Sequence, residues 1–153
     1  MILSSKLVND EMIIISTTKK FRYSKRLDNT NIWIIDIDGY TDENIDEILR
    51  VYTLIENLFI KNWYKPTETL ITKIMLWIFW NIPAFDRYFR KWLNIHSVNK
   101  INLKKIYNFY LENKNEIDSF QIKCYDFITE NNNSNKYTKA KIIDMYGFSK
   151  WYN

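Results

Sequence analysis

The sequence predicts a mainly α-helical protein, a single-domain bundle of about five to six helices. Its 153 residues include only two glycines and two prolines, too few for a fold that needs many tight turns. Apolar residues recur at three- and four-residue spacing along much of the chain, which is typical of helix faces that are buried in a core. The length suits one domain with a sizeable core, and we find no linker that would divide residues 1–153.

The first quarter of the chain lacks this helical pattern. We expect residues 1–40 to form a β-containing or irregular element in front of a helical core that covers residues 41–153. Residues 12–15 and 31–38 are rich in β-branched side chains, and an Asp-Gly turn signal follows the second run, so both are candidate strands. Between them, residues 19–26 mix basic and aromatic side chains. This segment is either a solvated connector or a phosphate-binding patch.

The segment WIIDIDGYT, residues 33–41, resembles the first motif of haloacid-dehalogenase-type phosphotransferases. The resemblance would make Asp36 a nucleophile and Asp38 a general acid beside a magnesium ion. That fold requires a parallel sheet, however, and the periodicity downstream of this segment is helical. A strand end that leads into a helix cap is therefore the favoured interpretation, and metal binding by the two aspartates is left open.

Two long helices and a break follow. Thr41 and the two acids after it form a good helix start, and an amphipathic stripe continues from there to about residue 60. The next helix covers residues 66–80 and is apolar on nearly every side, which predicts a buried central helix. The Asn-Ile-Pro sequence at residues 81–83 breaks it, and a further helix is expected from Pro83 to about Ile95.

The last third of the chain predicts three more helices. Apolar stripes run through residues 103–111 and 117–128, and both have helical spacing. The polar residues 130–135 are expected to form a loop. Thr138 is then placed to cap a last short helix that ends at Gly147.

Composition limits the possible functions. Two glycines cannot form a glycine-rich phosphate loop, and one cysteine with one histidine cannot form the usual zinc site, so we predict no metal and no cofactor. The single cysteine allows no internal disulfide, and we expect a cytoplasmic protein. No uncharged apolar run approaches the roughly 20 residues of a membrane span. A net charge of +4 is compatible with a DNA or RNA partner.

Candidate functional residues lie between residues 66 and 95. If Lys73 is buried with its helix, desolvation would lower its pKa and make the amine a nucleophile, with Asp86 nearby on the next helix. Alternatively, Lys73 extends into solvent and Asp86 caps that helix. The helix after Asp86 alternates cations with aromatic rings, which can hold phosphates and stack bases. The candidate nucleic-acid-binding residues are Arg87, Tyr88, Arg90, Lys91 and Trp92.

The motifs TKIML and PAFDRYF, which begin at Thr72 and Pro83, are similar to stretches of uncharacterised bacterial and phage proteins. They also distantly resemble the helix-hairpin-helix DNA glycosylases, especially the 8-oxoguanine-glycosylase-like members. The resemblance covers residues 66–95. It implies that Lys73 attacks the sugar C1′ and that Asp86 stabilises the oxocarbenium charge. A flipped base would then enter a pocket lined by residues such as Trp77 or Trp80. The glycosylase hairpin is glycine-rich, whereas PTETLIT here contains no glycine.

Three functions are therefore considered, in this order. The first is a small helical domain of bacterial or phage origin that binds nucleic acid or another macromolecule without catalysis. The second is a degenerate or active DNA glycosylase-like enzyme that uses Lys73 and Asp86. The third is a protein-binding inhibitor or scaffold module of a mobile element. An enzymatic role is uncertain, and the non-catalytic interpretation is preferred.

Overall fold

The computed structural model describes residues 31–62, 64–126 and 131–152, and this part of the chain is predominantly helical. The predicted mainly α-helical fold class is confirmed. The described residues contain six α-helices, two short 3-10 helices and one hairpin. The helices are α2 (Asp42–Lys61), α3 (Glu68–Ile78), α4 (Arg87–Leu93), α5 (Lys100–Glu112), α6 (Lys114–Ser119) and α7 (Lys139–Tyr152). The 3-10 helices are η1 (Asn31–Trp33) and η2 (Ile37–Gly39), and the strands are β1 (Lys123–Asp126) and β2 (Asn131–Lys136).

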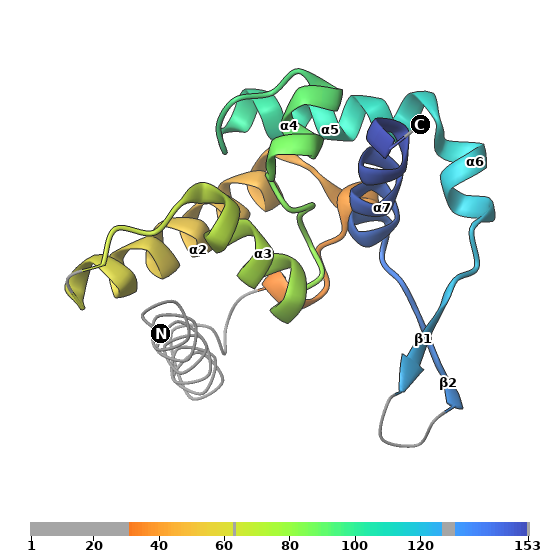
Figure 1. The fold of residues 1–153 in the computed structure, drawn as a ribbon, viewed down its shortest axis with the longest axis horizontal. Coiled ribbons are helices and arrows are strands. Elements are labelled where there is room, and N and C mark those ends of the chain that lie inside the picture. Colours follow the sequence, from red (N-terminus) through yellow and green to blue (C-terminus); the bar gives the residue numbers. More distant parts are fainter. Residues whose placement is uncertain (1–30, 63, 127–130, 153) are drawn as a thin grey trace.

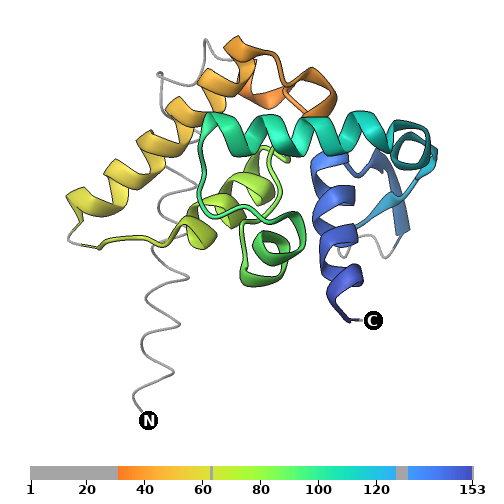
Figure 2. The same cartoon turned by 90° about the horizontal axis from the view of Figure 1, so that it is seen from above.

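The helices pack around a shared apolar core, while the hairpin extends away from the helical body (Figure 1). Helix α5 contacts α2 and η2, and α4 contacts α7. Seen from above, α5 runs along one side of the bundle, with α4 beside it and α7 at its end (Figure 2). The largest fully buried side chains include Tyr110, Phe85, Phe89, Ile45 and Met75. They come from α5, α4, α3, α2 and the connection before α4, so one core joins elements from most of the described chain.

The predicted strand at residues 31–38 is wrong, because this segment forms η1 and η2. The side chain of Asp36 accepts a hydrogen bond from the Ile37 amide at 2.8 Å and caps η2. It also accepts from the amides of Lys139 and Ala140 at the start of α7. An Asp side chain can hydrogen-bond to nearby backbone amides, and these bonds compete with the backbone pairing of a strand. The candidate strand at residues 12–15 and the basic segment 19–26 lie outside the described residues.

The predicted helix start is confirmed for α2 and corrected for α3, which begins at Glu68 and not at residue 66, and for α4. The hydroxyls of Thr41 and Thr67 cap α2 and α3. Helix α4 begins at Arg87, after the Asp86 cap, and not at Pro83. Residues 79–86 instead form a connection, in which the Ala84 amide bonds to a side chain of α7 and the Phe85 amide to a side chain of α3. The predicted helix at 103–111 is confirmed as α5, with Asn99 as its cap.

The predicted helix through residues 117–128 is wrong beyond α6, which ends at Ser119. Strand β1 follows and pairs antiparallel with β2, with Lys123 opposite Lys136 and Tyr125 opposite Asn132. The polar segment that was expected to be a loop thus provides the second strand. A short apolar run does not distinguish a helix from a strand by periodicity alone, and pairing across the hairpin decides the outcome here.

Helix α7 continues through Gly147, which was expected to end it. Gly147 is buried, and a Cβ at this position would lie 2.8 Å from Trp92 Cε3 and 2.9 Å from Phe89 Cδ2. The glycine therefore permits close packing of α7 on α4 and has no stop function. Thr138 does cap α7 as predicted, because its hydroxyl accepts from the Lys141 amide at 3.3 Å. Within the described ranges, no helix has the length and apolar character needed to cross a membrane.

We predict that Gly147→Ala destabilises the protein by about 1 kcal/mol. Alanine favours a helix by up to about 1 kcal/mol, but overpacking against two rings costs about 1–3 kcal/mol. Urea unfolding monitored by circular dichroism measures the difference, and Ser149→Ala on the exposed face of α7 is the control. A Gly147→Ala protein that is more stable than the parent would contradict the packing role.

Candidate functional site

A cleft of about 1170 Å³ lies between α3, the connection 79–86, the start of α4, the end of β2 and α7. Its walls combine aromatic rings with charged groups. The aromatic lining residues are Trp33, Trp77, Phe79, Trp80, Phe89, Tyr137 and Phe148, and the charged ones are Lys73, Asp86, Lys136, Lys141 and Asp144. Trp77 and Phe148 are 68% and 48% exposed. The cleft thus offers accessible aromatic surface together with cations.

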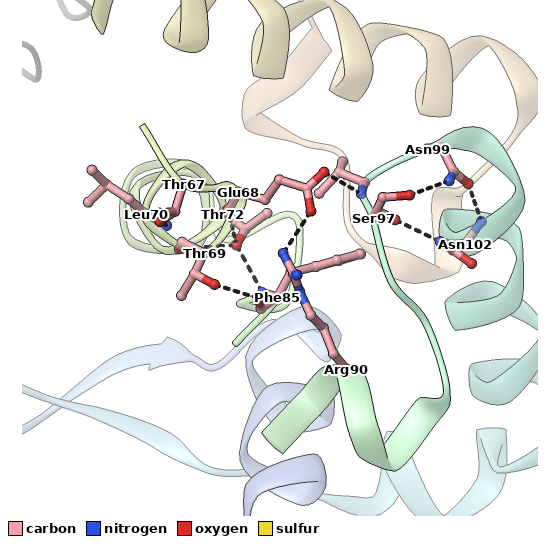
Figure 3. A network of polar contacts seen from close by, with 11 residues as sticks. Thr67, Glu68, Thr69, Leu70, Thr72, Phe85, Arg90, Ser97, Asn99 and Asn102 are labelled. Carbon is pink, nitrogen blue, oxygen red and sulfur yellow. Dashed lines mark hydrogen bonds and ion pairs between the residues drawn. The ribbon is translucent and has the colours of Figure 1, made fainter. Parts of the chain in front are cut away.

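Side chains of α3 and α7 hold the connection that forms the floor of this cleft. The hydroxyl of Thr72 accepts a hydrogen bond from the Phe85 amide at 2.9 Å, and the hydroxyl of Thr69 donates to the Phe85 carbonyl at 2.8 Å (Figure 3). On the other side, Asp144 Oδ1 accepts from the Ala84 amide at 3.0 Å. These bonds satisfy buried backbone groups that no helix or strand satisfies. They place the start of α4 against both α3 and α7.

The structure brings the two catalytic candidates, Lys73 and Asp86, to the same cleft. Asp86 Oδ1 accepts from the amides of Tyr88 and Phe89, each at 2.9 Å, so the expected helix-cap role is confirmed. Lys73 is exposed and not buried, which corrects the expectation of a desolvated amine. Among the described residues, its ammonium has no ion-pair partner. A solvated cation and a capping carboxylate therefore face one space.

Two of the five nucleic-acid-binding candidates lie at the rim of the cleft. The Arg87 guanidinium lies 4.8 Å from the centroid of the Tyr88 ring and donates to the Tyr88 hydroxyl at 2.8 Å. The Tyr88 ring is in turn 5.7 Å from the ring of Phe148, which lines the cleft. Arg87 and Tyr88 therefore extend the aromatic and cationic surface outward.

Two other candidates are used by the fold. Arg90 Nη2 forms an ion pair with Glu68 Oε2 at 2.7 Å, and Glu68 Oε1 accepts from the Val98 amide at 3.2 Å (Figure 3). Trp92 is half-buried, with its ring 4.8–5.6 Å from three other rings, those of Phe89, Phe109 and Tyr146. The fifth candidate, Lys91, is exposed. Arg90 and Trp92 are thus bound to neighbouring elements.

Sequence reasoning missed the opposite wall of the cleft, which comes from the end of β2 and from α7. Lys136 donates to the side chain of Gln121, and Lys141 forms an ion pair with Asp144 at 3.0 Å. Tyr137 lies between these lysines in the run KYTKAK. The alternation of lysines with an aromatic residue in this run is typical of a nucleic-acid-binding surface. The sequence does not show, however, that the fold places the run across the cleft from α3.

Asp36 and Asp38 bind backbone amides and a lysine, which differs from the nucleophile and general-acid roles that the phosphotransferase motif would give them. Asp36 accepts from the amides of Ile37 and Lys139, both at 2.8 Å, and of Ala140 at 3.0 Å. Asp38 forms an ion pair with Lys139 at 3.0 Å. Burial raises the pKa of Asp36, while its three amide bonds act in the opposite direction. In the part of the chain that the structure describes, no three His, Cys, Asp or Glu residues are grouped to hold a metal ion.

Comparison of the chain with protein-family models, curated proteins and solved structures found no match. The candidate site is therefore defined by the geometry and chemistry of its own side chains.

A buried tyrosine fixes the backbone at the edge of the cleft. The Tyr40 hydroxyl donates to the Asn81 carbonyl at 2.6 Å. The side chain of Asn81 is fully buried and donates to the Ile32 carbonyl at 3.4 Å. Asn81 directly follows Trp80, a cleft residue. Tyr40 thus links the segment before α2 to the start of the connection 79–86.

We predict that Tyr40→Phe lowers stability at neutral pH by about 1–2 kcal/mol, because the buried Asn81 carbonyl would be left without its donor. Burial raises the Tyr40 pKa well above its usual 10.0. The folded state therefore binds this proton more tightly than the unfolded state does. The resulting stabilisation is complete below pH 10 and is lost as the pH rises towards the folded-state pKa.

The stability difference between Tyr40→Phe and the parent should therefore shrink above about pH 10. Urea unfolding at a series of pH values from neutral to about pH 11 measures it. A difference that stays constant across that range would mean that Tyr40 ionises equally in both states.

Proposed function

We propose that the protein binds nucleic acid without catalysis and that the cleft between α3, α4 and α7 holds the nucleic-acid strand. One observation carries this proposal: Lys73 and Trp77, both exposed, lie one turn apart on α3 and line the same cleft. A cation beside an accessible indole ring can contact a phosphate and a base of one strand.

The charges of the cleft support a polyanionic ligand. Lys73, Lys136 and Lys141 line it, and Arg87 lies at its rim through the Tyr88 contact with Phe148. Of the two lining acids, Asp86 accepts two backbone hydrogen bonds and Asp144 is bonded to Lys141 and to the Ala84 amide. Lys141 and Asp144 balance each other, whereas Lys73, Lys136 and Arg87 outnumber the remaining acid, Asp86, so an incoming phosphate meets a net positive charge. Contacts between such cations and phosphates release counterions and make binding sensitive to salt.

The cleft is large enough to hold part of a polymer. Its volume of about 1170 Å³ exceeds the roughly 300–1,000 Å³ of typical small-molecule pockets. The net charge of +4 acts in the same direction by attracting polyanions. We extend the proposal to a cytoplasmic location, since the chain has a single cysteine.

We predict that the double variant Lys73→Glu, Arg87→Glu binds a fluorescent oligonucleotide at least about tenfold more weakly than the parent. The affinity of the parent should fall steeply with salt. For a single strand, the slope should decrease by about 0.7 for each phosphate that the variant no longer neutralises. Fluorescence anisotropy at several salt concentrations measures both quantities.

The matched control for this experiment is Lys61→Glu, Lys65→Glu, which makes the same change in net charge. Both residues are exposed and neither lines the cleft. An equal loss of affinity in this control would show that only net charge matters. Binding that is absent, or independent of salt, would remove the proposal and favour a protein-binding inhibitor or scaffold module.

A second candidate function is that of a DNA glycosylase-like enzyme, and the observation that favours it is the shared cleft of Lys73 and Asp86. In this candidate the deprotonated form of the Lys73 amine attacks C1′ of a damaged nucleotide, the C1′–N bond to the base breaks, and the base leaves and takes up the proton that the amine loses. Asp86 stabilises the oxocarbenium charge, and an imine forms between the amine and the opened sugar. Both hydrogen bonds from the helix amides go to Asp86 Oδ1, and within the described chain Oδ2 has no hydrogen-bond donor.

If this second function is active, borohydride should reduce the imine and trap a covalent complex with DNA that carries an abasic site. The adduct, resolved by denaturing gel electrophoresis, should disappear in Lys73→Ala and persist in Lys61→Ala. A chain that binds DNA but gives no adduct with any abasic or damaged substrate would retain the binding function and exclude the lyase.

A further inference from the structure

Trp80 has a backbone conformation that is unusual for a large side chain. Its φ is 60°, and Trp80 and Asn94 are the two non-glycine residues with positive φ in the described ranges. Each lies just beyond the end of a helix, Trp80 after α3 and Asn94 after α4. Glycine is usual at such positions, and asparagine is tolerated. A tryptophan there is an outlier.

The surrounding backbone holds Trp80 in this conformation from both sides. Its amide donates to the Met75 carbonyl at 3.2 Å, and the next residue, Asn81, is fixed through the Tyr40 hydroxyl at 2.6 Å. Strained residues persist only where such contacts over-determine them, and they concentrate at functional sites. The strain at Trp80 is therefore built into the fold.

The ring of Trp80 does not offset this strain by packing in the core. The side chain is half-buried and stays outside the main hydrophobic cluster, whereas Trp92 packs against that cluster. It lines the cleft, with its ring centroid 5.6 Å from that of Tyr137 and the two planes inclined by 34°. Trp80 follows α3 and Tyr137 follows β2, so the two rings come from different parts of the chain and lie next to each other at the cleft.

We propose that Trp80 and Tyr137 form a stacking surface for an unpaired nucleobase, so that the cleft selects single-stranded over double-stranded nucleic acid. This inference rests on the proposed function and specifies its ligand. Aromatic rings stack on any base, whereas the bases of a duplex are already stacked and paired. Lys136 precedes Tyr137 in the chain, and Lys73 lines the same cleft. Both cations can therefore contact the phosphates that flank a stacked base.

The test compares three proteins, the parent, Trp80→Gly and the control Asn94→Gly, on three ligands. The ligands are oligothymidylate, an oligomer of equal length without bases, and a duplex of equal length. Trp80→Gly removes the ring and relieves the left-handed strain, so we expect its Tm to be unchanged or raised. Its affinity for oligothymidylate should fall about tenfold, while its affinity for the base-free oligomer stays at the parent level.

The control makes the same kind of backbone change at the other left-handed position. Asn94 does not line the cleft, so Asn94→Gly should bind all three ligands as the parent does. Tyr137→Leu provides a second variant that should lose affinity for bases even if Trp80→Gly fails to fold. Oligouridylate replaces oligothymidylate in a parallel series to separate RNA from DNA.

The possible failures are distinguishable. If the parent binds none of the ligands, the proposed nucleic-acid function fails. If it binds the base-free oligomer or the duplex as tightly as oligothymidylate, the stacking inference is overturned and nucleic-acid binding stands. The same conclusion follows if removal of either ring lowers the affinity for all three ligands equally, or lowers it for none of them.

Discussion

The carboxylate of Asp36 joins two helix starts that are far apart in the chain. It accepts hydrogen bonds from the Ile37 amide in η2 and from the Lys139 and Ala140 amides in α7, which lie 103 and 104 positions further along the chain. Burial raises its pKa, and the three amides offset part of the cost of desolvating the charge. Because α7 provides one wall of the cleft, Asp36 helps to place that wall, together with the packing of α7 on α4 and the bond of Asp144 to the Ala84 amide.

The other walls depend on the irregular connection 79–86, whose backbone groups are satisfied by side chains rather than by a helix. Thr72 binds the Phe85 amide, Asp144 binds the Ala84 amide, and Tyr40 binds the Asn81 carbonyl. A segment fixed at this many points can hold a residue in an unfavourable conformation. The left-handed Trp80 and the aromatic surface of the cleft are consequences of this fixation.

The candidate functional residues fall into two groups: those that stabilise the fold and those that remain exposed without a structural role. Arg90 and Trp92 are engaged by Glu68 and by neighbouring rings, and Asp86 caps α4. Lys73 and Trp77 have no comparable structural task, since both are exposed on α3. A cation and a large ring that remain accessible in one cleft fit a binding role. Catalysis would require in addition that the capping Asp86 act on a substrate.

The sequence by itself determined the features that depend on neighbours in the chain. The spacing of apolar residues predicted the helical class and the approximate positions of α2, α3 and α5, and the caps at Thr41 and Thr138 predicted the starts of α2 and α7, because helix periodicity and capping are local. Tertiary structure alone decided the remainder. The segment around Asp36 became a cap for α7 instead of a strand, and Gly147 lies within a helix because Trp92 packs against it. The cleft likewise exists only because contacts between distant residues bring α3 and α7 together, and no local pattern encodes such contacts.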